Sequence, residues 1–289
     1  MRLACMVATA LAQGQNVTYK HFDCGTHIGH ATDDFKNTIN ALHINSRKGT
    51  SHAARAVSSK KAGTPITIDT YFHVITKTKS TGTITNTMAT AQAKALNDAY
   101  NPYNIFFNLK GVDYTVNDAW AVANGTDMTA LKKALRKGTY STLNLYFHTD
   151  LVGSILGTCT LPANMGTNPA AYVGDGCNIQ ANTMPGGNVL GYNLGKTAVH
   201  ETGHWLGLLH TFESYSCSGT GDFIADTPQQ SISTDGCPTK PAKDSCPGLA
   251  GVDPIHNYMD YSTDACYTGF TPLQQQRMQT LWATYRAGK

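Results

Sequence analysis

The sequence predicts an α+β domain that is split by a cleft and that occupies residues 62–289 of a chain of 289 residues. Three observations predict this fold class. Alternating β-branched and aromatic residues indicate three strands in the first part of the domain, a helix rich in histidine follows them, and the chain is then rich in loops before a last helix. A chain of this length can bury one sizeable core and still carry extensions.

The predicted elements follow one another along the chain. Residues 66–75 alternate as a strand, and residues 87–100 carry Ala, Leu and Met at helical spacing until an Asn-Pro pair ends the helix. The next elements are a strand at 104–116 with a kink at Gly111, a short helix at 127–137 and a central strand at 143–147. A Gly-, Pro- and Asn-rich loop at 153–176 leads to an edge strand at 177–181, a turn at 185–187 and a helix at 195–208. The last helix is capped by Thr271, begins with Pro272 and runs to about residue 286.

The segment before the domain is predicted to be a leader. An apolar run follows Arg2 and ends in Ala-Leu-Ala, which is typical of a signal peptide that is cleaved after residue 12. Residues 13–61 are polar and show no strong helical or strand period, so they are interpreted as a leader and linker. The net charge of +3 for the whole chain is too small to suggest nucleic-acid binding, and no other segment could cross a membrane.

Residues 200–210 read His-Glu-Thr-Gly-His-Trp-Leu-Gly-Leu-Leu-His, a pattern that suits a metal ion. On a helix, His200 and His204 lie one turn apart on the same face. Gly207 can adopt a positive φ, so the helix can end there and bring His210 back toward the same point. Three imidazoles can then hold Zn²⁺ and leave a position for water, and Glu201 is suited to take a proton from that water. The alternative, a core helix with aligned histidines, has no use for Glu201, one of only two glutamates in the chain.

This run resembles the zinc signature of the metzincin metalloproteases. Residues 257–261, Asn-Tyr-Met-Asp-Tyr, resemble the methionine-containing turn of those enzymes, and the pairing of the two segments is similar to the pappalysin family, in particular to small secreted fungal metalloproteases. The similarity covers about residues 66–286. It implies a twisted mixed sheet with the zinc helix in an upper half, and a loop-rich lower half with the methionine turn and the C-terminal helix.

The resemblance also implies roles for single residues. Met259 is expected to be an apolar floor beneath the zinc, and Tyr261 is expected to donate a hydrogen bond to the oxyanion of the reaction. The strand at 177–181 is expected to bind substrate in an antiparallel arrangement. Asn257 and Asp260 argue against another branch of the superfamily, such as the astacins.

Cys24, followed by Gly25, resembles the cysteine switch of metzincin zymogens. A thiolate at this position would occupy the open coordination site of the zinc and exclude the water. The alternative is a free or intermolecularly bridged thiol. A latent form of this kind needs a cut in the linker, for which Arg55–Ala56 and then Lys60–Lys61 are the expected sites.

Calcium and the disulfides are further implications of the resemblance. Calcium is expected at an oxygen-rich loop that contains Asp222, Asp226 and Thr227, with a solvated acidic loop as the alternative. Six cysteines remain besides Cys5 and Cys24, and they allow fifteen pairings. The resemblance favours the pairs Cys217–Cys246 and Cys237–Cys266, with Cys159–Cys177 as the pair left over.

Together these observations predict a secreted, extracellular zinc endopeptidase that is made as a zymogen. Residues 1–12 would be the signal peptide, 13–61 the propeptide and 62–289 the catalytic domain of a monomer that acts on proteins or peptides and binds neither nucleic acid nor membrane. Asn16 and Asn124 are candidate glycan acceptors. The alternative is a catalytically inactive domain that binds protein partners; it is disfavoured because the three histidines, Glu201 and Tyr261 are all present.

Overall fold

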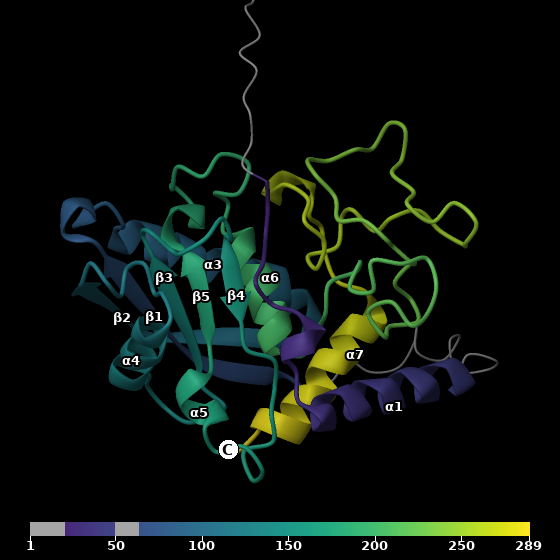
Figure 1. Cartoon of the computed structure of the whole chain (residues 1–289), viewed down its shortest axis with the longest axis horizontal. Coiled ribbons are helices and arrows are strands. Elements are labelled where there is room, and N and C mark those ends of the chain that lie inside the picture. The colour runs from purple at the N-terminus through teal and green to yellow at the C-terminus, as the bar shows by residue number, and fades with distance from the viewer. Residues whose placement is uncertain (1–20, 50–63) are drawn as a thin grey trace, which may run out of the picture.

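The computed structural model describes residues 21–49 and 64–289, and their strands form one five-stranded sheet in the order β2-β1-β3-β5-β4 (Figure 1). β1 pairs in parallel with β2 and β3, β3 pairs in parallel with β5, and β4 is antiparallel to β5. The strands are β1 Ile66–Thr76, β2 Ile105–Val116, β3 Leu143–His148, β4 Gly157–Cys159 and β5 Cys177–Gln180.

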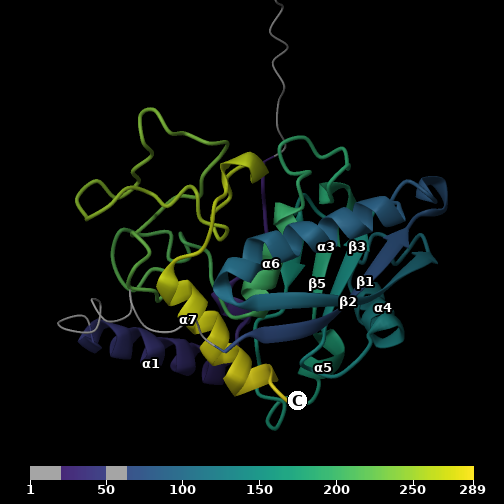
Figure 2. The same ribbon diagram turned by 180° about the vertical axis from the view of Figure 1, so that it is seen from behind.

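The helices of the domain lie on both sides of this sheet (Figure 2). They are α3 Asn86–Tyr100, α4 Thr126–Leu135, α5 Ala171–Gly174, α6 Lys196–Trp205 and α7 Pro272–Leu281, which continues as a π-helical turn, Trp282–Arg286. The larger apolar core lies between the sheet and α3 and α6, and it includes Phe72, Leu145, Leu96 and Val199. On the opposite face, Leu131 of α4 packs with Ile75 and Tyr146.

The structure confirms the predicted start of the last helix and the predicted kink at Gly111. The hydroxyl of Thr271 accepts the backbone N–H of Gln274, and the Gln274 side chain accepts the N–H of Thr271, so a capping box begins the last helix. The pairing of β1 with β2 skips one residue immediately before Gly111, where a kink was predicted.

The prediction that residues 13–61 carry no regular structure is wrong for part of that segment. Residues 33–49 form helix α1, Asp33–Gly49, which lies against α7 (Figure 1). Phe35 and Ile39 are fully buried against Leu281 and Tyr285 of the domain. These apolar residues recur every four positions among polar ones, so the helical period is weak in sequence and the stabilisation comes from packing against α7. The predicted signal peptide, Asn16 and both candidate activation sites lie outside the described residues.

The predicted position of the edge strand is also wrong. β5 begins at Cys177 as expected, but it lies between β3 and β4, so β4 is the outer strand at this end of the sheet. β4 is only three residues long and lies in the segment that was predicted to be a loop, which also contains α5. A Gly-Thr-Cys strand is too short to show the two-residue alternation that identifies strands in sequence.

Three disulfide bonds join Cys159–Cys177, Cys217–Cys246 and Cys237–Cys266, the pairing that the resemblance implied. The first joins β4 to β5, the second lies within the long loop between α6 and residue 257, and the third joins that loop to Cys266, after the methionine turn. Within residues 21–49 and 64–289, no helix has the length and apolar character that crossing a bilayer requires.

A buried cluster of charges ties the end of the chain to α6. The Asp175 carboxylate accepts hydrogen bonds from the Arg286 guanidinium, at 3.1 and 3.2 Å, and from the Trp205 indole, at 3.0 Å. Arg136 approaches the same carboxylate at 3.4 Å. Arg286 also donates to the backbone carbonyl of Trp205, the last residue of α6, at 3.0 Å. This cluster therefore fixes the helix that carries two of the three histidines.

Candidate metal centre and catalytic site

The three histidines of the motif meet at one point. Helix α6 ends at Trp205, Gly207 adopts φ 93°, and the chain turns back so that His210 faces the helix. The Nε2 atom of His204 lies 3.1 Å from Nε2 of His200 and 3.2 Å from Nε2 of His210. A side chain at position 207 would also overlap Leu281 of α7. Glycine is therefore required here both by the backbone and by packing.

The surroundings of these rings suit a metal ion. Nδ1 of His200 and of His204 lies 2.8 and 2.9 Å from the backbone carbonyls of Tyr258 and Leu208, and Nδ1 of His210 lies 3.2 Å from Glu213. Because Nδ1–H must donate to these oxygens, each Nε2 turns a lone pair toward the common point. Burial lowers the pKa of His200 and His204 well below the usual value, so both rings stay neutral. Three buried lone pairs this close repel one another unless a cation lies between them, and nitrogen donors are a set that zinc accepts.

Cys24 of the leader lies at the same point. Its Sγ is 3.5 Å from Nε2 of His204, and one ligand atom from each of Cys24, His200, His204 and His210 lies within 4.8 Å of all the others. The thiol is buried and forms no disulfide with any cysteine in residues 21–49 and 64–289. One sulfur and three imidazole nitrogens are four atoms of the types that bind zinc in proteins, and in this arrangement they could hold a metal ion.

The leader enters the cleft as an added strand. The N–H of Leu156 donates to the carbonyl of Asp23 at 2.8 Å, and the N–H of Gly25 donates to the carbonyl of Gly157 at 2.9 Å, so the leader pairs in parallel with β4. The Tyr261 hydroxyl accepts the N–H of Cys24 at 3.0 Å and lies 3.3 Å from Nε2 of His210. The backbone of the leader thus covers the outer edge of the sheet and also forms a hydrogen bond with the Tyr261 hydroxyl.

Glu201 points to the same place from α6. Its side chain is fully buried, and neither carboxylate oxygen has a hydrogen-bond partner within the described residues. Burial raises the pKa of this carboxyl to about 8. A Cβ atom at Gly157 of β4 would overlap Oε1 of Glu201, so only glycine leaves room for the carboxylate. Sequence reasoning did not find Gly157, because a lone glycine in a Gly-rich loop gives no signal.

Met259 packs against α6 at Gly203. It is fully buried, and a Cβ atom at Gly203, between the first two histidines, would lie 2.5 Å from its sulfur. The Asn257 side chain accepts the N–H of Met259 at 3.0 Å, and the Asp260 carboxylate accepts the N–H of Tyr261 at 2.8 Å. Side chains of the turn itself therefore set the positions of Met259 and Tyr261.

Glu213 is a residue of the site that sequence reasoning missed. Oε2 accepts from the backbone N–H of His210 at 3.3 Å and lies 3.2 Å from its ring, whereas Oε1 accepts the N–H of Ile28 in the leader at 2.8 Å. Burial opposes the charge on Glu213, but hydrogen bonds from His210 lower the pKa below its usual value. Both glutamates of the chain thus lie beside the histidines, a scarcity that could have pointed to Glu213.

The residues predicted to bind calcium are not all free to do so. Asp222 Oδ2 and Thr227 Oγ1 are buried, and neither has a hydrogen-bond partner among the residues that the structure describes. The two oxygens of Asp226, however, accept from the Thr271 hydroxyl at 2.7 Å and from the N–H of Leu273 at 3.0 Å, at the start of α7. The calcium site stays a prediction.

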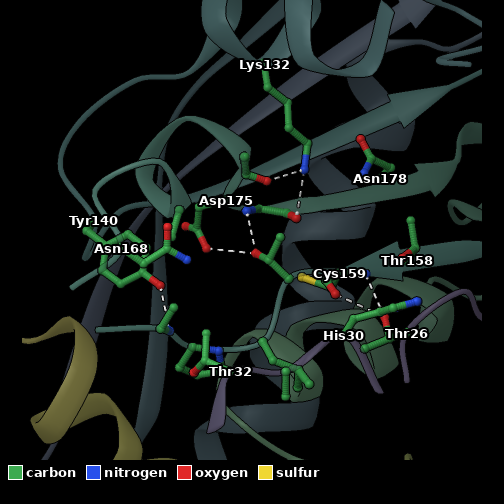
Figure 3. Close-up of a pocket in the computed structure, with 18 residues that line it drawn as sticks. Thr26, His30, Thr32, Lys132, Tyr140, Thr158, Cys159, Asn168, Asp175 and Asn178 are labelled. Atoms are coloured by element: carbon green, nitrogen blue, oxygen red, sulfur yellow. Dashed lines mark hydrogen bonds between the residues drawn. The ribbon is translucent and has the colours of Figure 1, made fainter. Parts of the chain in front are cut away.

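A cavity of about 320 Å³ lies beside the histidine cluster rather than in it (Figure 3). One wall is formed by leader residues such as Thr26 and Thr32, and the other by Thr160, Asn168 and Asp175 of the segment between β4 and β5. Of the predicted site residues, it contains only Cys159. The leader thus covers the sheet edge well beyond Cys24.

The whole chain is similar to extracellular metalloproteases of fungi. It is 45% identical over 287 residues to one from Neurospora crassa, and the alignment covers 99% of this chain and 96% of the relative. It is 48% identical over 260 residues to one from Aspergillus oryzae, with 80% of each chain covered. The family described as pregnancy-associated plasma protein-A matches residues 143–283.

The fold is similar to that of mirolysin from Tannerella forsythia. Mature mirolysin of Tannerella forsythia, solved in complex with a cleaved peptide, matches with a TM-score of 0.65 and 28% identity over 76% of this chain and 92% of its own. A promirolysin mutant of the same organism, at 24% identity, shares the fold over 90% of this chain and 94% of its own with a TM-score of 0.67. The predicted α+β class and the predicted family are confirmed: the chain belongs to the pappalysin family of metzincin metalloproteases.

Proposed function

We propose that this chain is a secreted zinc endopeptidase that is made in a latent form and cleaves proteins or peptides. The observation that carries the proposal is the convergence of the Nε2 atoms of His200, His204 and His210 on one point beside the Glu201 carboxylate. The names of the fungal relatives support export of the chain. Residues 1–12 would be removed as a signal peptide, 13–61 as a propeptide, and 62–289 would act as a monomeric catalytic domain.

The histidines would hold the zinc, and the remaining residues would handle the proton and the developing charge. A zinc ion at this position supplies a Lewis acid that lowers the pKa of water and polarises a carbonyl group. Glu201 would accept the proton of the attacking water and deliver it to the leaving amine. The Tyr261 hydroxyl would donate to the carbonyl oxygen as that oxygen gains negative charge. The edge of β4 would hold the peptide extended through backbone hydrogen bonds.

The leader would keep the enzyme latent because it contacts the metal site, the Tyr261 hydroxyl and the edge of β4, so that none of them is open to a substrate. Cys24 Sγ would complete the coordination of the zinc, its backbone holds the Tyr261 hydroxyl, and residues 23–25 cover the β4 edge. Helix α1 adds a second contact away from the metal, where the Tyr285 hydroxyl donates to Asp34 at 2.8 Å beside the buried Phe35. Release would follow a cut in the linker.

Removing the metal tests the zinc centre. We expect a chelator such as phenanthroline to abolish casein hydrolysis by the activated enzyme, because the water and the carbonyl both lose their Lewis acid. Stoichiometric zinc should restore the activity. If zinc alone restores all of it to EDTA-treated enzyme, the calcium prediction is contradicted; hydrolysis that survives complete removal of metal would contradict the zinc centre.

Replacing Cys24 tests the latent form. In the full-length chain, Cys24→Ala should raise peptide hydrolysis at least about tenfold, because the zinc loses a sulfur ligand that excludes water. Hydrolysis is measured while the leader is still attached, which gel electrophoresis verifies. Asn40→Ala, on the exposed side of α1, is the matched control and should stay latent. An equally latent Cys24→Ala chain would contradict the role of Cys24.

A further inference from the structure

Glu213 gives His210 a support that the other two histidines lack. Nδ1 of His200 and of His204 faces a neutral backbone carbonyl group, at 2.8 and 2.9 Å. Nδ1 of His210 instead faces a carboxylate oxygen, Oε2 of Glu213, at 3.2 Å. The same oxygen accepts the backbone N–H of His210 at 3.3 Å. One side chain therefore sets the position of both the ring and the backbone of the third histidine.

His210 needs this support because it lies outside the helix. Helix α6 ends at Trp205, so its hydrogen bonds place the first two histidines but not the third. After the helix, the N–H of Glu213 donates to the carbonyl of His210 at 3.0 Å, and this turn brings the Glu213 side chain back to His210. The Glu213 side chain is only 5% exposed, so water competes little for its oxygens.

The other oxygen of Glu213 is held by the leader. Oε1 accepts the backbone N–H of Ile28 at 2.8 Å. The leader thus contacts the histidine cluster at two points. Cys24 Sγ lies beside the Nε2 atoms of the histidines, and Ile28 donates to the carboxylate that supports His210. Glu213 therefore connects the leader directly to the third histidine.

These contacts require a carboxylate rather than an amide. Each oxygen of Glu213 accepts from N–H groups, one of Ile28 at Oε1 and two of His210 at Oε2. An ionised carboxylate accepts at both oxygens, whereas a glutamine side chain has one acceptor end and one donor end. A glutamine at position 213 could accept from His210 only by turning its NH₂ group toward the N–H of Ile28. A carboxylate beside the ring also makes the histidine a stronger metal ligand.

We propose that Glu213 is the positioning residue for the zinc ligand His210 and that the leader holds the same carboxylate through Ile28. Loss of the leader then frees Oε1 but leaves Oε2 on His210, so the third ligand stays in place when the enzyme becomes active. This proposal rests on the proposed zinc site. It adds the side chain that links metal binding to the leader.

The zinc affinity of the leader-free enzyme tests the positioning role. Competition with a chelator measures the zinc dissociation constant of wild type, Glu213→Gln and Glu213→Ala. We expect Glu213→Ala to raise the constant about 10–100-fold, as is typical when a metal-bound histidine loses its partner. Glu213→Gln should raise it by only about threefold, because the amide oxygen still accepts from His210 but carries no charge. Asp98→Asn, which removes an exposed carboxylate paired with Lys94, is the control and should bind zinc as wild type does.

The outcomes of this titration separate the proposal from the proposed function. Wild-type affinity in both Glu213 variants would overturn the positioning role. If Glu213→Ala does not fold, wild-type affinity in Glu213→Gln alone would do so, since that variant keeps the size of the side chain. A wild-type chain that binds no zinc would overturn the proposed function, and the positioning role with it.

The contact with the leader is measured without metal and without hydrolysis. In the metal-free full-length chain, the rate of Cys24 alkylation by iodoacetamide reports how often the buried thiol becomes exposed. Glu213→Gln and Glu213→Ala should both raise this rate about tenfold, because each loses the hydrogen bond from Ile28 to a charged acceptor. Glu213→Gln should therefore affect the leader more than the metal, a pattern that a general loss of stability does not produce. Asp98→Asn should react at the wild-type rate, and the same rate in both Glu213 variants would overturn the link to the leader.

Discussion

Replacing Glu201 by alanine is expected to lower kcat for peptide hydrolysis by about 10³-fold or more, since general acid–base catalysis contributes about 10²–10⁴-fold. The same carboxylate would take the proton from water and give it to the leaving amine, so both transfers are lost together. The histidines keep their hydrogen bonds to Tyr258, Leu208 and Glu213, none of which involves Glu201. Zinc binding and folding should therefore survive the change.

The measurement compares kcat for one peptide with zinc content and thermal stability in the same preparation. Glu201→Ala should bind one zinc per chain and unfold near the wild-type temperature, because it also removes a buried carboxylate that has no hydrogen-bond partner in the described part of the chain. Asp69→Ala, which removes an exposed carboxylate on β1, is the matched control and should keep full activity. Wild-type activity in zinc-loaded Glu201→Ala would show that another group is the base.

Sequence alone predicts much of this site because its chemistry depends on local spacing. His200 and His204 are placed by one helical turn, and Gly207 explains how His210 can return to them. The positions of Met259 and Tyr261 are also predictable, because both residues lie in a short segment whose own side chains hold its backbone. The main strands of the sheet follow from alternation over ten or more residues in β1 and β2.

What sequence could not predict depends on contacts between distant segments. Gly157 is required because Glu201 lies across from it, and Glu213 matters because it contacts both His210 and Ile28. The position of β5 inside the sheet depends on the pairing of a three-residue strand that no periodicity reveals. Helix α1 needs the surface of α7 to be stable, since a short helix with few apolar residues is marginal alone.

Replacing Asp175 by alanine is expected to lower the free energy of unfolding by about 3–5 kcal/mol, as for the loss of one partner from a buried ion pair. The side chains of Arg286 and Arg136 are 0% and 3% exposed, so both guanidinium groups would stay buried with no carboxylate. Asp175→Asn keeps the shape and one acceptor oxygen and should lose less. Chemical denaturation of the full-length chain measures the difference, and Asp98→Ala, from an exposed pair with Lys94, should cost under about 1 kcal/mol.

The Asp175 carboxylate should also make the free energy of unfolding depend on pH in the acid range. Burial alone would raise the pKa of Asp175, but the positive charges of Arg286 and Arg136 lower it below the ordinary value. The unfolded chain therefore binds a proton at this residue before the folded chain does, and the slope of stability against pH is positive in that window. The stabilisation is complete above about pH 4, the pKa of an unfolded aspartate, and is lost as the pH falls through the lower folded value. Wild-type protein should thus lose part of its advantage over Asp175→Asn between about pH 4 and pH 2, and an advantage that stays constant over that range would contradict the ion pair as its source.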